Sequence, residues 1–199
     1  MTSPMKSVAK SPLKPAMTSA ADPQLIREIP TLSTDRLILR ASRQDDFAGM
    51  CALWADPEVV RHISGTPSTP DVTWARLLHR AGHWQMLGWG GWAVELRATG
   101  EFIGEVGFGD YQRDITPALG LRPEAGWLLL PQHHGQGLAT EAVLAALAWA
   151  DAHFDQPTVC LIDPPNHASV RLAKRVGYGD TVETEFRGEP CLIMERPCQ

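Results

Sequence analysis

The sequence contains no apolar run near the roughly 20 residues that a membrane-spanning helix requires. It also lacks a basic excess, because 18 Lys and Arg residues stand against 23 Asp and Glu residues, for a formal net charge of −5. Nucleic-acid-binding proteins normally carry a basic surface, so this charge balance argues against that class. We therefore expect a cytoplasmic protein that binds neither a membrane nor a nucleic acid.

Closely spaced cysteine pairs are absent as well. The four cysteines are Cys51, Cys160, Cys191 and Cys198, and no two of them have C-x-x-C spacing. Cys51 and Cys160 have apolar neighbours in the sequence, which predicts buried, reduced side chains. His79 and His83 have helical metal-ligand spacing, but no third ligand is evident, so we predict no metal site.

The N-terminal segment has no acidic residue before Asp22 and is rich in Ser, Pro, Ala and Lys. Such a composition cannot bury a core, so residues 1–28 are predicted to form a disordered tail. Residues 29–199 have a length that suits a single domain.

Hydrophobic patterns and turn residues predict alternating strands and helices. The expected strands are 31–40, 91–97, 101–109, 127–130, 157–163, 179–187 and 190–196. The expected helices run from an N-cap at Ser42 through Trp54, over 56–60, from Asp71, from Leu138 and over 167–176. The helix from Asp71 is expected to place Trp74, Leu77, Leu78 and Trp84 on its apolar side.

The central stretch, residues 124–150, combines a short strand, a glycine-rich turn and a long Ala/Leu helix. Gly135 and Gly137 carry no Cβ, so the backbone can approach a ligand closely. The first turn of the following helix leaves its N–H groups unpaired, and the helix dipole adds positive potential there. This arrangement predicts an anion site suited to a phosphate or pyrophosphate.

The spacing Gln132-x-x-Gly135-x-Gly137, followed by Leu-Ala-Thr-Glu-Ala, resembles the acetyl-CoA motif of GCN5-related N-acetyltransferases (GNAT). More narrowly, it resembles the ribosomal-protein-alanine acetyltransferase (RimJ/RimL-type) branch. Two further segments resemble the same family in the same order: residues 34–40, and Asn166-x-x-Ser169 with the residues up to Tyr178. Together the resemblance covers residues 31–196.

The resemblance implies an α/β fold with a mostly antiparallel, twisted mixed sheet of about seven strands flanked by helices. Two central parallel strands would splay apart and admit the cosubstrate acetyl-CoA, with no metal involved. The implied cofactor-binding residues are Trp127, Leu128, Leu129, Gln132, His134, Gly135, Gln136, Gly137, Leu138, Ala139, Thr140, Asn166, Ser169, Lys174 and Arg175. Alternatively, Asn166 is a helix N-cap, and Lys174 and Arg175 lie on a solvated face.

In this family a primary amine attacks the thioester directly, within a ternary complex. The resemblance places the oxyanion donor on the backbone of Trp127–Leu129. Many relatives protonate the leaving thiolate with a tyrosine, but this chain has Ala173 at that position. Ser169 is therefore the candidate acid, unless its hydroxyl only bonds the helix backbone.

An ammonium acceptor must lose a proton before it attacks, which requires a base. Glu124, at the start of the central strand, and Glu105, within an apolar strand, are the candidates. Strand alternation could instead direct Glu105 to solvent. Glu141 is expected to support the glycine turn.

Two other functions stay open at this point. One is a coenzyme-A-binding module without transferase activity, which the missing tyrosine favours. The other is a dinucleotide-dependent oxidoreductase, although Thr140 replaces the third glycine of that motif and only Asp163 could imitate its ribose-binding acid. The acceptor is expected to be a small-molecule or peptide amine, and the final hairpin could mediate a homodimer.

Overall fold

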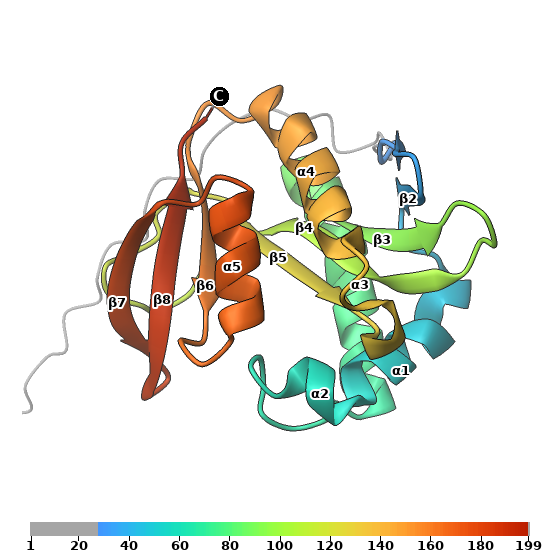
Figure 1. Ribbon diagram of the computed structural model, residues 1–199, viewed down its shortest axis with the longest axis horizontal. Helices are drawn as coiled ribbons and strands as arrows, with labels where there is room; N and C mark the ends of the chain where they lie inside the picture. Colours follow the sequence, from blue (N-terminus) through green and yellow to red (C-terminus); the bar gives the residue numbers. More distant parts are fainter. Residues whose placement is uncertain (1–27, 199) are drawn as a thin grey trace, which may run out of the picture.

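The computed structural model describes residues 28–198, which form an eight-stranded sheet covered by helices (Figure 1). The predicted tail lies outside the described residues except for Glu28. The strands are β1 Leu32–Ser33, β2 Leu37–Arg40, β3 Gly91–Leu96, β4 Phe102–Gly109, β5 Glu124–Leu129, β6 Thr158–Ile162, β7 Asp180–Phe186 and β8 Glu189–Arg196. The helices are η1 Gln44–Asp46, α1 Phe47–Ala55, α2 Pro57–Val60, α3 Pro70–Leu87, η2 Pro131–His133, α4 Leu138–Asp151 and α5 His167–Arg175.

The strand order is β1-β2-β3-β4-β5-β6-β8-β7, and every neighbouring pair except β5 and β6 is antiparallel. This confirms the predicted mixed sheet with two central parallel strands. The described residues form eight strands rather than about seven, because a turn divides the segment predicted as a single first strand. Thr34 closes this turn, donating its N–H to the Leu37 carbonyl and accepting the Leu37 N–H on Oγ1.

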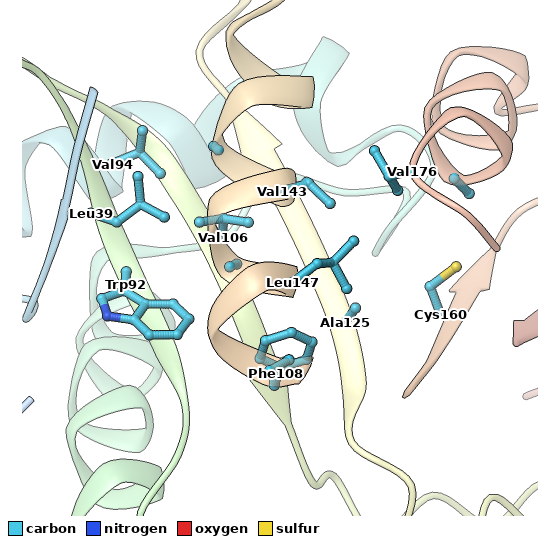
Figure 2. Close-up of a cluster of buried hydrophobic side chains, with 14 of the residues drawn as sticks. Leu39, Trp92, Val94, Val106, Phe108, Ala125, Val143, Leu147, Cys160 and Val176 are labelled. Carbon is cyan, nitrogen blue, oxygen red and sulfur yellow. The ribbon is translucent and has the colours of Figure 1, made fainter. Parts of the chain in front are cut away.

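The long helix α4 packs on the sheet through the side chains that its Ala/Leu pattern predicted. Val143 and Leu147 lie against Val106, Phe108 and Ala125 of β4 and β5 (Figure 2). Helices α4 and α5 lie on one side of the sheet, and α3 runs behind it (Figure 1). Helix α4 contacts β4 and β5 and helix α5 contacts β6, whereas α1 and α3 contact β4 and β3 and leave Gly126 of β5 exposed.

The predicted N-cap at Ser42 is wrong. A short 3-10 turn, η1, precedes α1, and its last residue Asp46 accepts the Arg43 N–H at 2.7 Å. The same carboxylate takes two hydrogen bonds of 2.8 Å from the buried Arg40 guanidinium. A buried arginine needs a carboxylate nearby, so this ion pair between residues six positions apart determines where the helix begins.

The predicted apolar side of α3 is partly wrong. Trp74 and Leu78 are 37% and 55% exposed, whereas Leu77 and Trp84 are buried as expected. The buried face also includes Thr73, which is four residues before Leu77 and therefore on the same side of the helix. Within residues 28–198, no helix is both long and apolar enough to cross a membrane.

The C-terminal elements follow the prediction closely. Asn166 caps α5 by accepting the Ser169 N–H at 3.1 Å, and Gly177 after the helix has φ 101°. Arg187 and Gly188, both with positive φ, form the two-residue turn between β7 and β8. Positive φ at both central residues matches the twist of a hairpin, so this turn fixes the strand register.

Candidate active site

The glycine-rich turn joins β5 to α4 and presents its backbone outward. Gly135 and Gly137 have φ angles of 72° and 79°, a region in which side chains are strained. Within residues 28–198, the amide N–H groups from Gly135 to Thr140 have no acceptor. A row of free N–H groups at a helix N-terminus can bind the oxygens of a phosphate.

An ion pair joins this turn to the segment before β2, toward the β1 edge of the sheet. Glu141, in the first turn of α4, accepts hydrogen bonds from Thr34 Oγ1 at 2.6 Å and from the Arg36 N–H at 3.0 Å. The Arg36 side chain also pairs with Glu141 at 2.6 Å and donates to the Gln136 carbonyl at 2.9 Å. Burial raises the pKa of Glu141, but the Thr34 and Arg36 hydrogen bonds outweigh it and lower the pKa below its ordinary value. The expected supporting role of Glu141 is confirmed.

Strands β5 and β6 diverge next to this turn. Their only register pair is Glu124 with Val159, and the Val159 N–H donates to the Pro123 carbonyl at 3.0 Å. Backbone groups alternate along a strand, so those of Trp127 and Leu129 also point toward β6, beyond the last pair. His134 Nε2 lies 2.8 Å from the Leu129 carbonyl. The Trp127 N–H therefore faces the gap, where an oxyanion donor is expected.

Helix α5 begins at the same end of the sheet. The Ser169 side chain is half-buried, and within residues 28–198 its hydroxyl makes no hydrogen bond, including none to the helix backbone. Tyr178 is packed instead: it is 1% exposed, its hydroxyl lies 2.9 Å from Thr158 Oγ1, and burial raises its pKa. Ser169 is thus the more available hydroxyl.

The predicted site residues fall into three groups in space. The carboxyl ends of β5 and β6 and the first turns of α4 and α5 lie close to one another (Figure 1). These elements carry Trp127, Leu128, Leu129, Gln132, His134, Gly135, Gln136, Gly137, Leu138, Ala139, Thr140, Asn166 and Ser169. Lys174 and Arg175 are exposed in the last turn of α5, at the opposite end of that helix. Glu105 and Glu124 form a third group on the α3 side of the sheet.

Glu105 is not directed to solvent, which corrects one of the two alternatives for it. Its side chain is 1% exposed and accepts hydrogen bonds from Trp54 Nε1 at 2.9 Å and Arg80 Nη2 at 2.7 Å. Arg80 Nε lies 2.5 Å from the other carboxylate oxygen, Oε1, which accepts no hydrogen bond from residues 28–198. A buried carboxylate that is ion-paired with an arginine is poorly placed to accept a substrate proton.

Glu124 is also engaged by an arginine. Arg113 binds it in a two-point contact, with distances of 2.5 and 2.7 Å. The Arg113 guanidinium in turn lies 4.8 Å from the centroid of the Tyr111 ring. The structure does not place either predicted base beside Ser169, and their catalytic roles remain predictions.

Sequence reasoning missed several residues. Arg76 and Arg80 are four apart on α3, and this helical spacing alone indicated a shared basic face. His62 Nδ1 lies 2.6 Å from Asp163 Oδ2 at the carboxyl end of β6. These residues are 101 positions apart in sequence, so no local pattern could have paired them.

Comparison with known proteins assigns the chain to a family. Residues 36–179 match the profile described as an acetyltransferase (GNAT) domain. The Bacillus subtilis protein YkkB is 30% identical over 172 residues, which cover 83% of this chain and 94% of YkkB. The chain belongs to the GNAT acetyltransferase family.

Solved structures agree with this assignment. A GNAT-family acetyltransferase from Bordetella pertussis is 33% identical with a TM-score of 0.74, covering 84% of this chain and 99% of that one. At lower identity, the fold alone is shared with two coenzyme A complexes. One is the ribosomal L7/L12 acetyltransferase RimL, at 15% identity and TM-score 0.68, covering 84% of this chain and 98% of that one. The other is spermidine N-acetyltransferase from Vibrio cholerae, solved with CoA and spermine. It has 18% identity and a TM-score of 0.65, covering 83% of this chain and 97% of that one.

The family and the sheet together decide against the oxidoreductase alternative. Dinucleotide-binding folds have an open, mostly parallel sheet with helices on both faces. Here only one strand pair is parallel, and the glycine turn leads to a splay rather than to a parallel neighbour. Among residues 28–198, no group of three or more His, Cys, Asp or Glu side chains could hold a metal ion.

Proposed function

We propose that the protein transfers an acetyl group from acetyl-CoA to a primary amine, by direct attack within a ternary complex. The observation that carries this proposal is the glycine turn beside the splayed β5–β6 pair. The turn offers a row of unpaired N–H groups for a pyrophosphate, and the splay offers the Trp127 N–H for the thioester oxygen. Few ligands other than an acyl-CoA need both features a short distance apart.

Each step of the transfer then has a residue to support it. The amides from Gly135 to Thr140 hold the pyrophosphate, and Asn166 lies beside the pantetheine arm. When the amine attacks the thioester carbon, its oxygen becomes an oxyanion that the Trp127 N–H stabilises. Ser169 donates its proton to the departing thiolate and regains one from water. The attacking nitrogen loses a proton to water or to a carboxylate, with Glu124 the more exposed of the two candidates.

The finer assignment to the RimJ/RimL branch rests on the N-x-x-S spacing of Asn166 and Ser169. We place the reaction in the cytoplasm because all four cysteines are free thiols, as a reducing compartment favours. The names of the two CoA-bound neighbours specify a protein N-terminus and a polyamine, so both acceptor classes belong in a first screen.

One observation favours a second candidate, a coenzyme-A-binding module without transferase activity. Ala173 replaces the tyrosine of many relatives, and the nearby Tyr178 hydroxyl is occupied by Thr158. If Ser169 does not supply the proton, neither Ala173 nor Tyr178 replaces it. Such a module would bind acetyl-CoA without releasing thiol in the presence of any amine.

Isothermal titration with acetyl-CoA tests the proposal, with the double variant Gly135→Val/Gly137→Val as its counterpart. Wild-type binding should be micromolar. The variant should lose at least about 100-fold in affinity, because β-branched residues cannot adopt these φ angles without strain. A matched control is Gly120→Val, which also has a positive φ, of 68°, but lies in the loop before β5.

A wild type that binds no acetyl-CoA, while its circular dichroism shows a folded protein, would contradict the proposal. Equal loss of binding in the Gly120 control would show that folding, rather than the turn, accounts for the result. Release of free thiol with an amine present then distinguishes the transferase from the binding module.

A further inference from the structure

Arg76 is a partly buried cation without a counter-ion. Its guanidinium carbon lies 3.8 Å from the ring centroid of Trp54, and its buried Nε has no hydrogen-bond partner in the described part of the chain. Within residues 28–198, no carboxylate oxygen lies within 4 Å of it. Burial is the main cause that lowers the pKa of Arg76, and the nearby charge of Glu105 opposes it only in part.

The neighbouring charges are already matched with one another. Arg80 pairs with Glu105, and Arg113 pairs with Glu124. We call the set Arg76, Arg80, Glu105, Tyr111, Arg113 and Glu124 the α3-side cluster. Its two ion pairs are neutral overall, so the charge of Arg76 gives the cluster a net positive charge. Leaving a cation desolvated and unpaired costs free energy, which indicates that something else supplies the anion.

There is open space on this side of β5. Glu105 is opposite Leu128 in the sheet register, and Gly126 lies between Leu128 and Glu124 on the same face. Gly126 is exposed, and a Cβ placed there would meet no atom within 4 Å. The adjacent Trp127 directs its backbone toward the β6 gap. A molecule that contacts Gly126 on the α3-side face of β5 is therefore separated only by β5 from the expected thioester in the β5–β6 gap. It lies on the face of the sheet opposite α4.

We propose that the amine acceptor binds over Gly126 on the α3 side, and that it carries a carboxylate which pairs with Arg76. This inference rests on the proposed function and names its substrate class: a small amine with an anionic group, such as a free amino acid or a short peptide. A guanidinium binds a carboxylate through two parallel hydrogen bonds, and stacking on Trp54 holds its plane in place. A polyamine would instead meet an unpaired like charge, which disfavours it.

The test compares acceptors that differ only in the carboxylate. The acceptors are dipeptides with a varied N-terminal residue and a C-terminal alanine, each prepared as the free acid and as the C-terminal amide. The two members of each pair have nearly the same amine but differ in charge at the C-terminus. The twenty common amino acids and spermidine complete the panel, and thiol release is measured at saturating acetyl-CoA. We expect kcat/KM at least about tenfold higher for the acid of each reactive pair. Arg76→Gln should abolish this preference, and Arg76→Lys should keep part of it.

Three further variants separate binding from folding. Gly126→Val should raise the acceptor KM without changing acetyl-CoA affinity, because the side chain fills space that nothing else occupies. Arg61→Gln, an exposed arginine after α2, should keep the acid preference. Arg76→Met keeps the stacking on Trp54 and removes the unpaired charge, so its Tm should stay level or rise.

Several results would overturn the inference. They are a preference for amides or spermidine, an acid preference that survives in Arg76→Gln, a fall of several degrees in the Tm of Arg76→Met, or turnover of other acceptors in the panel without turnover of any acid. Failure of acetyl-CoA to bind, or binding without turnover of any acceptor, would contradict the proposed function instead, so the two failures are distinguishable.

Discussion

The glycine turn and the α3-side cluster use opposite means to build a site. The turn is made of backbone: its N–H groups are exposed, and its conformation depends on two glycines that follow the end of β5 by six and eight residues. The cluster is made of long side chains from α3, β4, β5 and the loop after β4, joined by ion pairs over up to 25 residues. A site made of backbone can therefore be recognised from a local sequence pattern. A site assembled from side chains far apart in the sequence has no such local pattern.

The largest expected effect tests whether Glu105 supports the fold rather than the chemistry. Glu105→Gln leaves the Arg80 charge without its partner, and we expect a loss of about 3–5 kcal/mol in the free energy of unfolding. Urea denaturation followed by tryptophan fluorescence measures it. Arg97→Gln, an exposed arginine at a strand end, is the control for loss of a charge. A Glu105→Gln protein of unchanged stability but reduced turnover would show that the cluster contains the base.

A smaller effect concerns Ser169, on the cofactor side of the comparison. Ser169→Ala removes the proposed proton donor but keeps the N–H that Asn166 caps. We expect kcat to fall about tenfold, less than the roughly 100-fold or more that general acid catalysis typically contributes, because water can substitute for the hydroxyl. Acetyl-CoA affinity should be nearly unchanged. Ser169→Thr, which keeps the hydroxyl, is the matched variant. Equal rates for Ser169→Ala and wild type would show that Ser169 is not the proton donor.

The smallest expected effect tests how much Glu141 contributes to stability. Replacing it by Gln should cost about 1 kcal/mol of stability, since Arg36 is half-exposed and water screens the pair. The pKa of Glu141 is lowered in the fold, so its contribution is complete above the unfolded value near 4.3 and is lost as the pH falls through the lower folded value. Thermal melts between pH 3 and 7 should show a gentler acid slope for Glu141→Gln. An unchanged slope would mean that Glu141 does not titrate with folding.

Features set by residues close together in the sequence could be predicted, and features set by contacts between side chains in the fold could not. The Ala/Leu pattern of α4, the glycines of the turn and the Asn166 cap each depend on residues a few positions apart, and all were predicted. The cap at Ser42 failed because Arg40 draws Asp46 into a buried ion pair. The exposed Trp74 and Leu78 were misplaced because hydrophobicity alone does not determine which side of a helix meets the sheet. Glu105 had an ambiguous pattern until Arg80, 25 residues away, was placed beside it.

The bond between Glu141 and the Thr34–Arg36 turn has a consequence for motion. It joins the first turn of α4 to the short edge strands β1 and β2 across 105 residues of sequence. Opening of that edge would release Arg36 from both Glu141 and the Gln136 carbonyl, and so loosen the turn. By linkage, a ligand that requires the ordered turn must suppress this opening. Amide hydrogen exchange in Leu37–Arg40 should therefore slow on addition of acetyl-CoA, although these residues lie outside the proposed binding site.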